Sequence, residues 1–129
     1  MDRAISPNEA KVVNWLLDHA LGDVTPYRLH PVEELRVVGG CDCGCTSLYF
    51  KPREQRGKMQ MLADELAVYP EGEQAGLILW GCEGEIVQLE VYDFQPNSSH
   101  RAPDVSNLCT WDELGRRDLE QAKRSHPIR

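Results

Sequence analysis

Three cysteines, Cys41, Cys43 and Cys45, alternate with other residues in one short turn. Alternate side chains of an extended backbone point to the same side, and Gly44 lets the chain bend, so the three sulfurs can converge. Three thiolates held together suit a soft or borderline cation such as Zn²⁺ or Cu(I). The alternation therefore makes these three residues candidates for a zinc site. The candidates for a fourth ligand are Cys82, Cys109, His30 and His100.

Two other interpretations of the cysteine turn stay open. Structural zinc sites use cysteines in pairs two to four residues apart, and the chain has no C-x₂-C pair. The thiols are then either a redox or nucleophilic group, or small apolar residues in a glycine-rich hairpin. Five cysteines without an export signal indicate reduced thiols rather than a disulfide framework.

Glu90 is the second residue that we single out. It lies between Leu89 and Val91 in an alternating segment, on the same side as Gln88 and Tyr92. If that side of the sheet is covered, a carboxylate there needs a partner and is a candidate for catalysis together with Tyr92. If that side is open, alternation alone explains Glu90.

The charge balance argues against nucleic acid as a partner. The 129 residues hold 14 basic and 21 acidic side chains, a net charge of −7, which repels phosphate backbones. The N-terminus has no apolar core of a signal peptide, and the longest apolar stretch is far too short to cross a membrane. The expected location is therefore the cytoplasm. The common catalytic glycine loops and nucleophile elbows are absent, which favours a protein that is not an enzyme.

The first helix is predicted to begin at Ser6, with Pro7 in the first position and Glu9 closing a capping box. It is expected to end at Gly22 in a left-handed turn. Trp15 widens the apolar stripe of this helix. Its ring either packs into the core or lies on a surface that binds another protein or a second copy of the chain.

Two hairpins are expected between this helix and a second one. Residues 35–38 and 46–51 form the first pair of strands, joined by the cysteine turn, and residues 77–80 and 86–94 form the second pair around Glu83-Gly84. Residues 59–69 fit either a helix or a strand, and residues 95–108 are expected to be a loop. Thr110 caps the second helix, which runs to about Arg124. The chain is thus predicted to be a single α+β domain over residues 1–129, with an antiparallel sheet of four or five strands and both helices on one face.

Three features together resemble a group of small bacterial proteins of unknown function. They are the turn Cys41-Asp42-Cys43-Gly44-Cys45, the segment Tyr69-Pro70-Glu71-Gly72, and the hairpin that ends in Leu89-Glu90-Val91-Tyr92. The resemblance covers roughly residues 35–95 and implies the two-hairpin arrangement. It departs at Asp42, where the group often has glycine, and it implies no activity.

Size, charge and the wide apolar stripe predict a non-catalytic binding protein, such as an acidic partner or immunity-type protein for a basic target. The alternative is a metal-binding or thiol-active protein that uses Cys41, Cys43 and Cys45.

Overall fold

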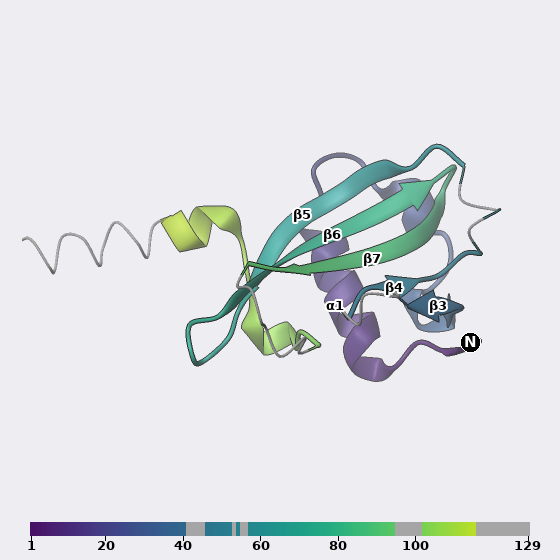
Figure 1. The fold of residues 1–129 in the computed structure, drawn as a ribbon. Coiled ribbons are helices and arrows are strands. Elements are labelled where there is room, and N and C mark those ends of the chain that lie inside the picture. Colours follow the sequence, from purple (N-terminus) through teal and green to yellow (C-terminus); the bar gives the residue numbers. More distant parts are fainter. Residues whose placement is uncertain (41–45, 53, 55–56, 95–101, 116–129) are drawn as a thin grey trace, which may run out of the picture.

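Six antiparallel strands form the main sheet, in the order β3-β4-β7-β6-β5-β8 (Figure 1). The computed structural model describes residues 1–40, 46–52, 54, 57–94 and 102–115. The strands are β3 (Gly39–Gly40), β4 (Leu48–Tyr49), β5 (Gln60–Val68), β6 (Gln74–Cys82), β7 (Glu85–Asp93) and β8 (Leu108–Cys109). The prediction of helices combined with an antiparallel sheet is confirmed. The predicted strand number of four or five is wrong, because β8 and the glycine strand β3 extend the sheet to six.

In the first predicted hairpin, the strand that pairs with β4 is residues 39–40 instead of residues 35–38. A separate two-stranded sheet pairs β1 (Arg3–Ala4) with β2 (Arg36–Val37), so residues 36–37 do not join the main sheet. Instead β3 pairs with β4, and β4 pairs with β7. Glycine carries no apolar pattern by which a strand is recognised, yet its backbone hydrogen-bonds like any other.

Residues 59–69, which fitted either a helix or a strand, form β5 for almost their whole length. β5 pairs with β6 from Gln60↔Gly81 to Val68↔Gln74, with a register shift between Met61 and Ala63. The turn between them contains Gly72 at φ 91°, in the left-handed region that glycine tolerates. β5 and β6 are therefore a third hairpin that the sequence reading left undecided.

Helix α1 (Pro7–Asp18) begins as expected. The Ser6 hydroxyl accepts from the Glu9 N–H at 3.1 Å, and Glu9 Oε1 accepts from the Ser6 N–H at 2.8 Å. Arg3 bonds the same carboxylate and lowers the pKa of Glu9. The expected end at Gly22 is wrong, because the helix stops at Asp18 and His19 caps it through an N–H to Leu16 O.

The β6–β7 hairpin closes through Glu83 and Gly84, at φ 48° and 82°. Both residues have positive φ, as a two-residue type I′ hairpin turn requires. Leu89 and Val91 belong to the core, whereas Gln88, Glu90 and Tyr92 lie on the other side of the sheet. Strict alternation would put Ile86 on that side too, but a register shift between Trp80 and Gly81 places it in the core.

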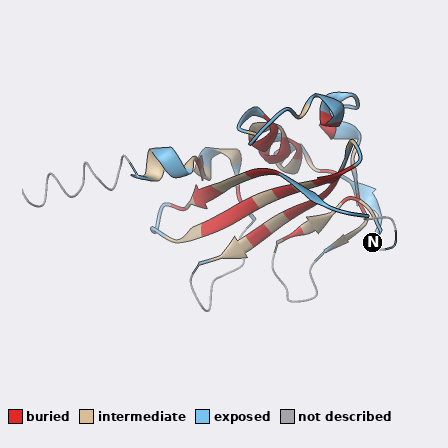
Figure 2. Cartoon of the chain, turned by 90° about the horizontal axis from the view of Figure 1, so that it is seen from above, coloured by how far each residue is buried: buried red, intermediate tan, exposed pale blue. Residues whose placement is uncertain are grey.

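The core lies between α1 and one side of the sheet, as Figure 2 shows by its buried residues. Val13, Leu16 and Leu17 of α1 belong to it, as do Leu77 and Leu79 of β6. The short 3₁₀ turns η1 (Thr25–Arg28) and η2 (Val32–Glu34) complete the same layer through Tyr27 and Val32. The opposite side of the sheet, away from α1, is called the outer face below.

The end of the described chain differs from the expected loop. The segment predicted as a loop over residues 95–108 contains the 3₁₀ turn η4 (Val105–Asn107) and the start of β8. Residues 111–115 are helical, and the Thr110 hydroxyl accepts from the Glu113 N–H at 3.1 Å, as the predicted cap requires. The rest of that helix lies outside the described residues. Among the described helices, none has the length and hydropathy to cross a membrane.

Candidate functional site

Strand register gathers three rows of side chains on the outer face. Residues that face each other in antiparallel strands project to the same side of a sheet. The rows are Cys109, Leu66, Gly76 and Tyr92; then Asp64, Ile78 and Glu90; then Met61, Trp80, Gln88 and Tyr49. The central strands β6 and β7 therefore present tryptophan, tyrosine and glutamate next to one another.

Trp80 and Glu90 are joined across two of these rows. The indole Nε1 of Trp80 donates to Oε1 of Glu90 at 2.9 Å. Because the two residues are diagonal neighbours, this bond draws the indole along the face rather than letting it stand away from it. Both side chains are half-buried. The sequence left open whether the Glu90 carboxylate has a partner. It has one, and that partner is the neutral indole N–H of Trp80.

Two further polar groups of β7 carry unused hydrogen-bonding capacity. Gln88 is 8% exposed, and its carboxamide makes no hydrogen bond within the described part of the chain. The Tyr92 hydroxyl likewise has no hydrogen-bond partner there. Burial raises the pKa of the Tyr92 phenol, and the charges of Asp64 and Glu90 act in the same direction, so the hydroxyl keeps its proton and can donate.

An aromatic ladder of Tyr92, Phe94 and Trp111 continues the face toward β8. The ring centroids are 5.5 Å apart for Tyr92 and Phe94, and 6.0 Å apart for Phe94 and Trp111. The Tyr92 ring lies over Gly76, where a Cβ atom would meet its Cζ. Phe94 and Trp111 are 39% and 41% exposed. Exposed aromatic rings of this density on one side of a small protein are typical of contact surfaces.

The charges within the three rows have one sign. Asp64 and Glu90 are the charged residues of the rows, and both are acidic. Trp111 Nε1 lies 3.5 Å from Asp64 Oδ1, which ties the aromatic ladder to this carboxylate. The face therefore combines aromatic rings with negative charge, the combination that attracts cationic side chains.

The predicted thiol site is not visible in the structure. Cys41, Cys43 and Cys45 lie outside the described residues, as does His100. Cys82 and Cys109 are buried cysteines, placed six positions apart along β6 by the register, about 20 Å at the rise of a strand. Within the described ranges, no group of three or more His, Cys, Asp or Glu side chains could hold a metal ion. Zinc at the turn stays a prediction.

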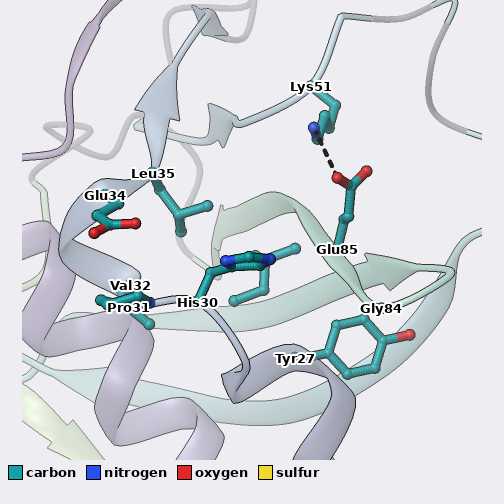
Figure 3. Close-up of a pocket in the computed structure, with 10 residues that line it drawn as sticks. Tyr27, His30, Pro31, Val32, Glu34, Leu35, Lys51, Gly84 and Glu85 are labelled. Atoms are coloured by element: carbon teal, nitrogen blue, oxygen red, sulfur yellow. Dashed lines mark ion pairs between the residues drawn. The ribbon is translucent and has the colours of Figure 1, made fainter.

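The candidate fourth ligand His30 lines a separate hollow of about 260 Å³, next to Gly84 and Glu85 at the β6–β7 turn (Figure 3). Its floor is apolar, with Tyr27, Leu35 and Ile86, and Lys51 Nζ pairs with Glu85 Oε1 at 3.2 Å on its rim. Glu34 also lines this hollow, so its charged groups are two carboxylates and one ammonium group besides His30.

The Trp15 side of α1 has its own arrangement. Trp15 packs partly against the core, and its ring stacks on His19 at a centroid distance of 3.9 Å. His19 lines a hollow of about 460 Å³ with Glu65, Trp111 and Asp112. Burial raises the pKa of the Glu65 carboxyl, whereas the Trp111 backbone N–H acts to lower it. One face of the Trp15 ring is therefore already occupied.

The sequence placed Gln88, Glu90 and Tyr92 on one face but missed their neighbours. Trp80 comes from the facing strand, and Asp64 from a segment whose structure was undecided. The signal that was available is the Tyr69-Pro70-Glu71-Gly72 turn, because a turn between two apolar runs favours a hairpin. Comparisons with models of protein families, with curated proteins and with solved structures found no match to this chain.

Proposed function

We propose that this chain is a non-catalytic binding protein that holds a positively charged segment of another protein on the outer face of its sheet. The observation that supports this proposal is the set of aromatic rings and carboxylates on that face. A net charge of −7 adds a long-range attraction for basic partners. The same charge makes two copies of the chain repel each other, which favours a different protein over a homodimer as the occupant.

The outer face suits this role better than the Trp15 side of α1. Trp15 already stacks on His19 and packs against the core, whereas Met61, Phe94 and Trp111 are each more than a third exposed. Apolar rings that are surrounded by polar groups give most of the affinity of protein contacts, and peripheral charges set the rate and the choice of partner.

The test is a selection of binding segments from a displayed library of random peptides, using the full chain. We expect the selected segments to be rich in arginine and lysine and to bind more weakly as salt increases. Ile78→Lys places a positive charge in the middle row and is expected to weaken binding at least about tenfold, because like charges in an interface cost several kcal/mol.

Leu21→Lys is the matched control, because it adds the same charge in place of a similar side chain. Leu21 is 64% exposed and follows α1, on the side of the sheet opposite the outer face. This variant is expected to bind within about twofold of the parent. Selected segments without positive charge, or equal loss in both variants, would contradict the proposal. Self-association that only Ile78→Lys abolishes would identify a second copy as the occupant.

The thiol turn provides a second proposal, favoured by the alternation of Cys41, Cys43 and Cys45. If these thiolates hold zinc, native mass spectrometry of protein purified under reducing conditions will show one metal ion per chain. Cys43→Ser is then expected to lose that ion, since three protein ligands are too few for a closed structural site. A bare protein mass, with all five thiols reactive after unfolding, would make the turn a purely structural element.

A further inference from the structure

The Trp80–Glu90 pair and the neighbouring Gln88 leave a place on the outer face that fits a flat cation. We infer that this place takes an arginine side chain of the basic partner, an inference that rests on the proposed function and adds the chemistry of recognition to it. Each of the three residues supplies one part of the fit.

Glu90 supplies the charge. One of its carboxylate oxygens accepts from Trp80 Nε1 at 2.9 Å, and the second oxygen has no partner within the described residues. The indole bond restrains the Glu90 side chain, so the second oxygen samples fewer directions before any partner arrives. A charged donor on that oxygen makes a stronger hydrogen bond than a neutral one.

Gln88 supplies an acceptor that no described residue uses. It faces Trp80 directly across the strands and precedes Glu90 by two positions on the same side of β7, about 7 Å away at the rise of a strand. Its side chain is 8% exposed, yet its carboxamide makes no hydrogen bond in the described part of the chain. The carboxamide atoms are not among the buried polar atoms of the described chain that lack a partner, so they reach solvent and the amide oxygen can accept from an external donor.

Trp80 supplies the surface on which the cation lies. A guanidinium stacks flat on an indole and still donates from its edge, because its five N–H groups lie in the plane of the group. It can therefore donate to Glu90 and Gln88 while it covers Trp80. An ammonium group is a compact point charge and cannot meet all three residues at once, so the site is selective for arginine over lysine.

The surroundings fit an arginine as well. Ile78 lies between Glu90 and Asp64 in the middle row and offers an apolar contact for the methylene stem of the side chain. The three rows contain two carboxylates and no basic residue, so no cation of the rows themselves competes for Glu90.

The experiment titrates the ¹⁵N-labelled full chain with two blocked tripeptides, Gly-Arg-Gly and Gly-Lys-Gly. The Trp80 indole signal is assigned by its loss in Trp80→Phe. We expect the arginine peptide to shift this signal and the Gln88 side-chain amide signals, with a Kd at least about fivefold below that of the lysine peptide. Glu90→Gln is expected to weaken the arginine peptide about tenfold, because a charge-assisted hydrogen bond becomes a neutral one.

Glu83→Gln removes the same charge in the β6–β7 turn and is expected to leave the Kd within about twofold. Equal Kd values for the two peptides, or an unchanged Kd in Glu90→Gln, would overturn the inference. The two proposals fail separately. Library segments that depend on Ile78 but not on Glu90 would leave the binding function standing without the arginine site. If arginine binds at Trp80 but the library yields no binding segment, the arginine site stands and the proposed binding function fails.

Discussion

Leu77→Ala is expected to lower the free energy of unfolding by about 3–5 kcal/mol, the upper range for truncating a buried leucine. Leu77 has no exposed surface and lies at the centre of β6, facing Val91 on one neighbouring strand and Glu65 on the other. The core on that side is closed by α1, so the structure cannot collapse easily into the cavity. Urea unfolding, followed by tryptophan fluorescence, measures the change.

Ile78→Ala is the control for this prediction, and it also tests the outer face. Ile78 is the next residue along β6 and projects to the other side, where it is only half-buried. We expect a loss of about 1–2 kcal/mol, from partial burial and lower strand propensity. If the two variants lose the same stability, then the outer face is as fully covered as the core, and it cannot be a free docking surface.

Ser47→Ala is expected to cost about 2–4 kcal/mol, although it removes a single oxygen atom. Ser47 is 4% exposed, and its hydroxyl accepts from the Val91 N–H at 2.8 Å and donates to the Val91 carbonyl at 3.1 Å. The side chain thus replaces one step of the backbone ladder between β4 and β7. Alanine leaves two backbone groups of β7 without partners in a buried place.

Hydrogen exchange at the Val91 amide identifies this mechanism. In Ser47→Ala the amide is expected to exchange much faster, because its acceptor is gone. Ser106→Ala is a suitable control, since the Ser106 hydroxyl also donates a hydrogen bond, to Asp104 at 2.8 Å, but in an exposed turn. Its expected cost is below about 1 kcal/mol. An unchanged exchange rate at Val91 would show that Ser47 is not a necessary part of the ladder.

The parts of the fold that the sequence predicted are those with local signals. The capping box at Ser6 and the turn at Glu83-Gly84 each need only a few adjacent residues, and both are present. β5 was undecided because Met61, Leu62, Leu66 and Ala67 also fit a helix. What makes it a strand is the pairing with β6 along almost its whole length, and no short window contains that information.

The shortest strands were not predicted from the sequence, for a related reason. A strand of two residues, such as β1, β3 or β8, is too short to show a period, so these strands form where the backbone finds a partner. In the candidate site, too, the features set by neighbouring residues in the sequence were predicted, and those set by pairing between strands were not. Alternation along β7 placed Gln88, Glu90 and Tyr92 on one face, but the bond from Trp80 depends on the register between two strands. The position of Trp111 depends on the packing of a distant segment.

The bond between Trp80 and Glu90 also has a consequence for the speed of binding. β6 lies between β5 and β7 along nearly its whole length, so the two side chains are already held in place in the free protein. Ordering a long side chain at an interface costs about 0.5–1.5 kcal/mol of entropy, and here that cost falls mainly on the partner. The rate of encounter is then set by diffusion and by the attraction of opposite charges, whereas the contacts of the face determine how long the complex lasts.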